Sequence, residues 1–157
     1  MTNEEQRITE AYRIWHKAWS DETKDLDLAN ARVAGRSTKA YPDRENAYWW
    51  NEQGPQWVDN YISWRKSNTN WKIWKTPQGA RAIEIELNPV IADVPVKMVI
   101  DRVFEVDGEL IIVDLKTSAR RPISDLQLGF YKVGLEMMLG VKVNQGNYWM
   151  SRDSGTG

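Results

Sequence analysis

Two aspartates and one lysine carry the clearest chemical signal in this sequence. Asp101 and Asp114 stand on either side of the dipeptide Asp107-Gly108, and Lys116 follows two residues after Asp114. Asp-Gly between two runs of apolar residues predicts a hairpin with a two-residue type I′ turn. When the residues flanking such a turn pair with each other, the register places Asp101 directly opposite Asp114. The sequence therefore predicts two carboxylates that face each other across neighbouring strands.

The facing carboxylates require a compensating charge. Opposed side chains on paired strands have Cβ atoms about 4.5 to 5.5 Å apart, and like charges at that distance destabilise a sheet. A divalent cation offsets the repulsion, since magnesium binds carboxylate oxygens and keeps positions open for water and phosphate. A shared proton or a nearby lysine or arginine is the alternative. Solvent is expected to screen the pair poorly, because both strands are otherwise apolar, with Met98, Val99, Ile100, Val103, Ile111, Ile112 and Val113.

Lys116 is expected on the same face as Asp114, because side chains alternate along a strand with a period of two. A metal ion, an ammonium group and a phosphate can then meet in one place. In such a site the aspartates hold one or two metal ions and the metal activates a water molecule. Lys116 orients that water or stabilises the charge that develops on the scissile phosphate. The alternative without chemistry is a buried ion pair between aspartate and lysine.

These residues resemble the motifs of the PD-(D/E)XK nuclease superfamily, and within it the RecB-like exonucleases of bacteria and their phages. The resemblance covers roughly residues 83–149, in the order of an aspartate, a D-x-K and a Q-x-x-x-Y motif. It implies a metal-dependent phosphodiester hydrolase on an α/β, restriction-endonuclease-like core. Asp101, Asp114 and the Leu115 carbonyl are then ligands of Mg²⁺ or Mn²⁺, and Lys116 is catalytic. The matching pieces are Val99-Ile100-Asp101-Arg102, Val113-Asp114-Leu115-Lys116-Thr117 and Gln127-Leu128-Gly129-Phe130-Tyr131.

Gln127 and Tyr131 are further catalytic candidates. The resemblance puts both on the helix beside the site, and their spacing of four residues independently places them on one helix face. From that face they can contact the substrate or a metal-bound water. A capping glutamine and a packing tyrosine are the alternative.

An extra carboxylate near the metal is expected from the first strand. Glu84 and Glu86 share the polar face of that strand, and their spacing does not choose between them. Many members of the family place a metal-binding histidine after a glycine in an N-terminal helix. The one histidine of this chain, His16, lacks that context, so we predict a structural or exposed role for it.

Arg120 and Arg121 follow the strand of Lys116 directly. Together with Thr117 they are expected at the mouth of the site, where contacts to phosphate position a nucleic acid without reading its sequence. A solvated loop is the alternative.

A second basic segment contains tryptophan between its cations. Residues 61–83 include no acidic residue. Trp71, Lys72 and Lys75 are its candidates for gripping a single strand through base stacking and phosphate contacts. Tryptophan at such spacing also packs in cores, which is the alternative.

The composition fits one nuclease domain over 1–157, with a helical part over 1–80 and a catalytic α/β core over 81–150. A formal net charge of −1 means that nucleic-acid contact must come from a local basic patch. The absence of cysteine excludes disulfides, zinc–thiolate sites and iron–sulfur clusters. With no export signal or membrane-spanning run, we expect a cytoplasmic location in a bacterial or phage-infected cell.

The elements that must position these residues follow from hydrophobic periodicity. Helical spacing predicts helices over 4–20 and 44–66, the second kinked or interrupted at Gly54-Pro55. A period of two predicts strands over 83–87, 94–106, 110–116 and 143–150. A helix is expected from Ser124 as its N-cap, with Gln127 completing a capping box, to Leu139, with Gly140 as its C-terminal cap. The ending 151–157 is expected to fray.

Together the motifs predict a deoxyribonuclease that depends on one or two Mg²⁺ or Mn²⁺ ions. We expect an exonuclease acting on linear or single-stranded DNA in recombination, repair or phage DNA processing. The alternatives are a structure-specific or restriction-type endonuclease, and a non-catalytic module that binds DNA or protein on the same fold. A helicase or recombination protein is an expected kind of partner, since no phosphate-binding glycine loop indicates an ATPase in this chain. The sequence indicates no oligomeric state.

Overall fold

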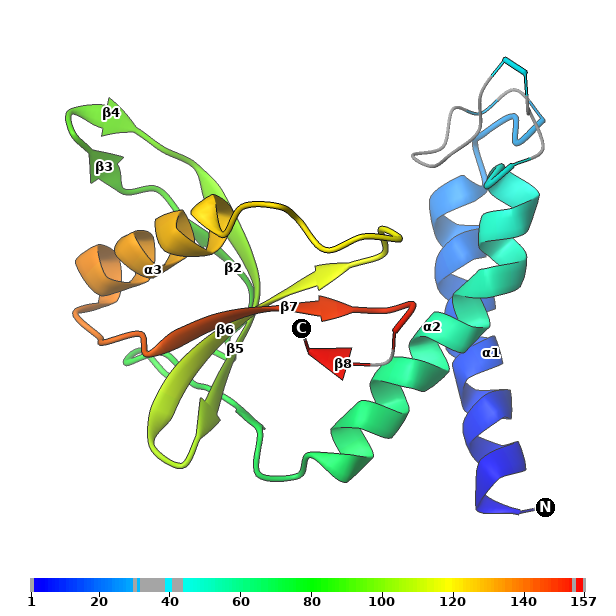
Figure 1. Ribbon diagram of the computed structural model, residues 1–157, viewed down its shortest axis with the longest axis horizontal. Coiled ribbons are helices and arrows are strands. Elements are labelled where there is room, and N and C mark those ends of the chain that lie inside the picture. The colour runs from blue at the N-terminus through cyan, green and yellow to red at the C-terminus, as the bar shows by residue number, and fades with distance from the viewer. Residues whose placement is uncertain (1, 30, 32–38, 41–43, 154, 157) are drawn as a thin grey trace. The chain divides into compact units, whose positions relative to one another are not determined.

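The computed structural model of the protein describes residues 2–29, 31, 39–40, 44–153 and 155–156. The chain divides into two compact units, Met1–Lys66 and Ser67–Gly157 (Figure 1). The division falls at the end of the second helix, and a short strand at Lys72–Ile73 already pairs within the sheet of the second unit. The expectation of a single domain stays a prediction.

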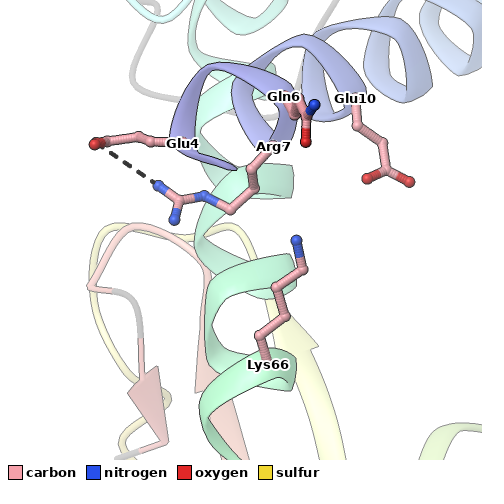
Figure 2. A pocket seen from close by; sticks show the side chains of 5 residues that line it. All are labelled: Glu4, Gln6, Arg7, Glu10 and Lys66. Carbon is pink, nitrogen blue, oxygen red and sulfur yellow. Dashed lines mark ion pairs between the residues drawn. The ribbon is translucent and has the colours of Figure 1, made fainter. Parts of the chain in front are cut away.

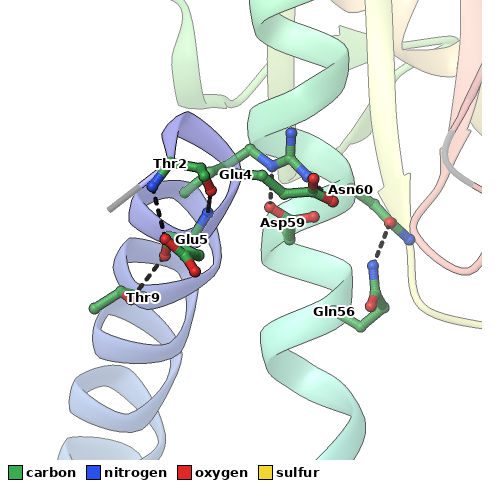
Figure 3. A network of polar contacts seen from close by, with 8 residues as sticks. Thr2, Glu4, Glu5, Thr9, Gln56, Asp59 and Asn60 are labelled. Carbon is green, nitrogen blue, oxygen red and sulfur yellow. Dashed lines mark hydrogen bonds and ion pairs between the residues drawn. The ribbon is translucent and has the colours of Figure 1, made fainter.

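The N-terminal unit is built from two helices, α1 (Asn3–Thr23) and α2 (Ala47–Ser67). A capping box starts α1: the Thr2 hydroxyl accepts the Glu5 N–H at 3.2 Å, and the Glu5 carboxylate accepts the Thr2 N–H at 2.6 Å (Figure 3). This arrangement satisfies two backbone groups that a helix end leaves unpaired. Both predicted helices are confirmed, with ends that differ by no more than three residues.

Tryptophan rings pack the two helices together. Gly54 of α2 lies so close to the Trp15 ring of α1 that a Cβ atom at residue 54 would overlap the ring. The Trp15 indole N–H donates to the Asn51 side chain at 3.1 Å. The buried Trp57 meets Trp15 edge to face, with 6.3 Å between ring centroids. Gly54 therefore permits the close approach of the helices, and α2 continues through Pro55 as one helix.

A surface pocket of about 520 Å³ lies on this unit (Figure 2). Arg7 lines it and forms ion pairs with Asp59, at 2.6 Å, and with Glu4, at 4.0 Å; Figure 2 shows the second pair. The positive charge of Arg7 is therefore already balanced. None of the residues predicted to do chemistry lines the pocket, whose walls are Glu4, Gln6, Arg7, Glu10 and Lys66.

The second unit is a mixed sheet with one helix on it (Figure 1). Strands β5 and β6 form an antiparallel hairpin at its centre, and β1 and β2 both pair with the free edge of β5. Helix α3 (Leu126–Leu139) joins β6 to the parallel strand β7 and packs on the sheet. The strands are β1 (Lys72–Ile73), β2 (Ile83–Leu87), β5 (Met98–Val106), β6 (Glu109–Lys116), β7 (Gln145–Met150) and β8 (Gly155–Thr156).

One predicted strand is divided in two. Val94–Pro95 (β4) pairs with Val90–Ile91 (β3) in a small separate hairpin, and β5 begins only at Met98. Ala92 and Asp93 form the turn that directs β4 back onto β3, since both have left-handed backbone conformations, with φ of 50° and 64°. Two residues with positive φ form the tight turn that a two-residue hairpin needs. The prediction of one continuous strand over 94–106 was therefore wrong.

The ends of the last elements also differ from prediction. Strand β7 begins at Gln145 rather than residue 143, because the Val143 N–H donates to the Glu136 carboxylate at 2.9 Å instead of to a strand. The predicted frayed ending contains a short strand, β8, which pairs with β7. The C-terminal cap of α3 is confirmed at Gly140, with φ of 65°.

The result is a mixed α/β fold with an N-terminal helical part and a central mixed sheet, as predicted. Fully buried side chains from the three central strands form the core of the sheet unit, among them Ile100, Val103, Ile112 and Tyr148. Within the part of the chain that the structure describes, no helix is long and apolar enough to cross a membrane.

Candidate active site

The central hairpin has the predicted turn. Asp107 and Gly108 both have positive φ, 51° and 84°, as a type I′ turn requires. Five facing pairs follow in the predicted register, from Val106 opposite Glu109 to Arg102 opposite Val113. The register on which the chemistry depends is therefore confirmed up to the residues beside the two acids.

Regular pairing between β5 and β6 stops one step before the acids. Asp101 and Asp114 are not a backbone pair in the described sheet. Instead, the Asp101 carboxylate accepts the Leu115 N–H at 2.8 Å through Oδ2, and the Arg102 guanidinium donates to the Asp101 carbonyl. The side chain of Asp101 thus takes the place of a strand partner, and this contact fixes the orientation of its carboxylate.

The same point of β5 is irregular on its other edge. Ile83 and Ile85 of β2 pair with β5, but Glu84 between them has φ of 51° and does not pair with Asp101. Ile100 and Val103 are both fully buried in one core cluster, although strict alternation puts residues three apart on opposite faces. The strand therefore changes its alternation between Ile100 and Val103, the stretch that contains the candidate ligand Asp101.

Asp114 is buried within β6, with 2% of its surface exposed. Its Oδ2 lies 2.6 Å from the ammonium of Lys116. Burial raises the pKa of the Asp114 carboxyl; the Lys116 ammonium opposes that rise and the charge of Asp101 adds to it. The site therefore holds a carboxylate whose ionised form is costly without a neighbouring cation.

Lys116 connects the strand to helix α3. Its ammonium donates to the Gln127 side-chain oxygen at 3.0 Å, and the Gln127 amide donates to the Tyr131 hydroxyl at 2.8 Å. The four-residue spacing places both helix side chains toward β6, as predicted. A continuous polar chain thus runs from Asp114 through Lys116 and Gln127 to Tyr131.

The predicted capping box at the start of α3 was wrong. The N-cap is Asp125, which makes no capping hydrogen bond, and the Ser124 hydroxyl accepts the Leu126 N–H at 3.1 Å. Gln127 does not reach back to the helix start, because its side chain is engaged by Lys116 and Tyr131.

Tyr148 is a site residue that the sequence reasoning missed. It lies on β7 directly beside Asp114 in the parallel register and is fully buried. Its hydroxyl donates to the Ser124 carbonyl at 3.0 Å. Burial, and then the charge of Asp114, raise the pKa of this hydroxyl. The only sequence signal was its place in a predicted strand, which does not specify the neighbouring strand.

The structure brings neither Glu84 nor Glu86 to the two aspartates. Glu86 forms an exposed ion pair with Lys97 at 3.0 Å, and the hydrogen bond from Lys97 lowers the pKa of its carboxyl. The Glu84 side chain is largely exposed and lies 4.0 Å from Arg102. Among the described residues, no three acidic or histidine side chains form a metal-binding group. The expected third carboxylate is therefore absent from this arrangement.

His16 lies in α1, in the N-terminal unit. Its ring packs against Tyr12, with 4.1 Å between ring centroids. That contact is of the structural kind that we predicted for this histidine.

The predicted DNA-contacting residues fall into two groups. Thr117, Arg120 and Arg121 lie in an exposed segment directly after β6. Arg121 forms an ion pair with Asp125 at 3.5 Å. This segment adjoins Lys116 and remains open to a ligand.

Trp71 and its neighbours lie beside β5. The Trp71 ring meets Phe104 edge to face, with 5.7 Å between centroids, and Trp74 packs on the core cluster. Lys72 and Lys75 are exposed. The ring contacts favour packing over base stacking for these tryptophans.

Comparison with known proteins agrees with the geometry. A family model of the PD-(D/E)XK nuclease superfamily matches residues 4–155. The chain belongs to the PD-(D/E)XK nuclease superfamily. The mixed sheet with its central hairpin and covering helix is consistent with the restriction-endonuclease-like fold of that superfamily.

Two relatives from mycobacterial phages share the sequence over most of its length. The chain is 31% identical over 164 residues to the Gene 69 protein of Mycobacterium phage D29, covering 91% of this chain and 59% of the relative. It is 29% identical over 183 residues to the Gene 69 protein of Mycobacterium phage L5, covering 90% and 62%. The chain thus spans about three fifths of the length of these relatives.

The donor set suits the divalent metals that PD-(D/E)XK nucleases generally use. Asp101 and Asp114 present hard carboxylate oxygens, which magnesium and manganese prefer. The raised pKa of Asp114 gives a physical reason for a cation, since a positive charge favours its ionised form. The residues present therefore fit such an ion.

Proposed function

We propose that this chain is a Mg²⁺- or Mn²⁺-dependent deoxyribonuclease that hydrolyses phosphodiester bonds. The observation that carries the proposal is the cluster of Asp101, Asp114 and Lys116, held together by hydrogen bonds and a 2.6 Å ion pair in a superfamily of nucleases. We further propose an exonuclease acting on linear or single-stranded DNA during recombination, repair or phage DNA processing in the bacterial cytoplasm.

Each residue has a role that follows from its contacts. Asp101 and Asp114, with the Leu115 carbonyl, would hold one or two ions. When bound, such an ion supplies Lewis acidity and lowers the pKa of a coordinated water. Asp101 is oriented for this role because its Oδ2 is held by the Leu115 N–H. Asp114 is kept close to its ionised state by Lys116, against the effect of burial.

Lys116 is the group that meets the phosphate. Its ammonium is held between Asp114, at 2.6 Å, and Gln127, at 3.0 Å, so it is positioned before a substrate arrives. A positioned cation stabilises the charge that grows on the scissile phosphate and costs little reorganisation. Gln127 and Tyr131 keep Lys116 in this orientation through their mutual hydrogen bond.

Thr117, Arg120 and Arg121 are proposed to contact the DNA backbone beside the cleavage point. Lys72 and Lys75 are exposed and can add phosphate contacts, whereas Trp71 is engaged with Phe104. A helicase or recombination protein is the kind of partner we propose for such a nuclease.

The test uses linear, nicked and closed circular DNA with Mg²⁺, with Mn²⁺ and with EDTA. We expect metal-dependent degradation that Asp114→Asn abolishes. Asp107→Asn is the matched control, because it makes the same change in the turn of the same hairpin, where asparagine also tolerates positive φ. Degradation of linear DNA alone indicates an exonuclease, and cutting of closed circles an endonuclease. No cleavage under any condition, or full activity of Asp114→Asn, would overturn the proposal.

A further inference from the structure

The buried ring of Tyr148 carries two cations. Lys116 Nζ lies 5.6 Å from the ring centroid, and the guanidinium carbon of Arg121 lies 5.7 Å from it. The tyrosine itself is fully buried, so the two side chains cover its ring rather than compete with solvent for it. Cations over an aromatic face are attracted by its quadrupole. One side chain thus sets the place of the candidate catalytic lysine and of an arginine from the following segment.

The two neighbouring arginines are not equivalent. Arg121 is fixed from two sides, by the Tyr148 ring and by the 3.5 Å ion pair with Asp125, yet its side chain is 47% exposed. The Arg120 side chain is exposed and has no ion pair, hydrogen bond or ring contact among the described residues. Arg121 therefore presents a guanidinium held by two contacts, whereas the guanidinium of Arg120 has no such contact among the described residues.

The hydroxyl of Tyr148 holds the backbone of the same segment. It donates to the Ser124 carbonyl at 3.0 Å, between Arg121 and the start of α3. The ring therefore places the Arg121 side chain, and the hydroxyl places the chain that carries it. These two contributions can be separated by substitution.

We propose that Arg121 binds a DNA backbone phosphate near the one attacked, and that Tyr148 is its positioning residue. Lys116 Nζ and the guanidinium carbon of Arg121 lie within 6 Å of the same ring centroid, so the two groups are at most about 11 Å apart. Phosphates of one strand succeed each other at a rise of about 3.4 Å, so a cation within that distance of Lys116 meets a phosphate one to three nucleotides along the strand. A guanidinium suits this role because it binds phosphate oxygens in a bidentate manner. The ligand class is a phosphodiester backbone, read without regard to sequence. The inference rests on the proposed function, since it takes Lys116 as the group at the scissile phosphate.

Binding in EDTA tests this site without catalysis. The probe is a fluorescent single-stranded oligonucleotide, and the readout is the Kd across a series of salt concentrations. We expect Arg121→Gln to weaken binding about tenfold, as the loss of one charged hydrogen-bonded contact does. The slope of log Kd against log salt should become smaller by about 0.7, which is the contribution of one phosphate contact on a single strand. Lys142→Gln is the matched control: it removes one exposed cation after the far end of α3, where no DNA contact is proposed, and should change the Kd less than about twofold.

Tyr148 variants test the positioning role. Tyr148→Leu, which removes the ring, should reproduce the binding loss of Arg121→Gln, and combining the two should add little further loss. Tyr148→Phe keeps the ring and should lose less. Thermal unfolding checks that each variant folds. If Tyr148→Leu does not fold, the difference between Tyr148→Phe and wild type in Kd decides the contribution of the hydroxyl.

The outcomes separate the two proposals. If the wild type degrades DNA with Mg²⁺ but Arg121→Gln and Lys142→Gln bind DNA alike, the phosphate site is refuted and the nuclease stands. If the wild type binds DNA through Arg121 but never cleaves it, the nuclease is refuted and the phosphate site stands. If the wild type binds no DNA in EDTA, the preformed phosphate site is refuted.

Discussion

Lys116→Met should lower the free energy of unfolding, because it leaves the buried Asp114 carboxylate without its neighbouring cation. Asp114 is 2% exposed, and its Oδ2 lies 2.6 Å from the Lys116 ammonium. Removing one partner of a buried ion pair typically costs about 3 to 5 kcal/mol, because the other charge is left unpaired. The lysine side chain is 25% exposed, so water reaches the pair from that side. We therefore expect a loss of about 2 kcal/mol of unfolding free energy at pH 8 without metal.

The loss should depend on pH in a defined direction. The pKa of Asp114 is already raised in the folded protein, chiefly by burial, so the folded state binds its proton more tightly than the unfolded chain. Without the ammonium this pKa rises further. The deficit of Lys116→Met is therefore full above the folded pKa and shrinks as the pH falls through it. It is relieved once the carboxyl of the folded wild type is protonated as well, which happens above its ordinary value of 3.8 because the folded pKa is raised.

The assay is urea unfolding at pH 8 and pH 5, with EDTA or with Mg²⁺. Asp114→Asn should remove the pH dependence, and the double variant should recover most of the loss, with a coupling energy of about 1 to 3 kcal/mol. Mg²⁺ should stabilise Lys116→Met more than the wild type, because the ion then meets no competing ammonium. Lys97→Met, which breaks the exposed pair with Glu86, is the matched control and should cost under about 0.5 kcal/mol. An equal deficit at both pH values, or full additivity with Asp114→Asn, would refute the reasoning.

Gly54→Ala and Gly129→Ala should shift the unfolding free energy in opposite directions. The first forces a methyl into the ring that packs on α2 and should cost more than about 1 kcal/mol, whereas the second adds a methyl in open space and should gain about 0.5 to 1 kcal/mol. Urea unfolding checks both, and a neutral Gly54→Ala would contradict the described helix packing. Glu86→Gln should leave Mn²⁺ affinity unchanged in calorimetry, because Lys97 engages that carboxylate, while Asp101→Asn should weaken it more than about tenfold. Loss of affinity in Glu86→Gln would place that carboxylate at the metal.

Local signals predicted the parts of the site that depend on short stretches of chain. Asp-Gly between two apolar runs strongly favours a two-residue type I′ turn. The turn at Asp107-Gly108 and the strand register beside it could therefore be predicted from the sequence. The four-residue spacing of Gln127 and Tyr131 was equally local. The capping box failed because two local interpretations competed for Gln127, and only the nearby Lys116 decided between them.

Residues whose role depends on a distant strand could not be predicted. Tyr148 lies beside Asp114 only because the α3 crossover brings β7 parallel to β6 in that register. Glu84 and Glu86 shared a polar face in the sequence, but the left-handed backbone at Glu84 and the Lys97 side chain keep both from the aspartates. In the N-terminal unit, helical spacing predicted both helices, but not that Gly54 would lie against the ring of Trp15.

The irregular step at Asp101 links the failure of the regular register to the chemistry. A strictly paired hairpin would commit the Leu115 N–H to a backbone carbonyl of β5 and leave the Asp101 side chain free to rotate. Because pairing stops at Arg102, the N–H needs another acceptor, and the Asp101 carboxylate provides it at 2.8 Å. The hydrogen bond that gives the Leu115 N–H an acceptor therefore also orients a candidate metal ligand. Regular strand pairing is lost at the residue whose carboxylate regular pairing would leave without a partner.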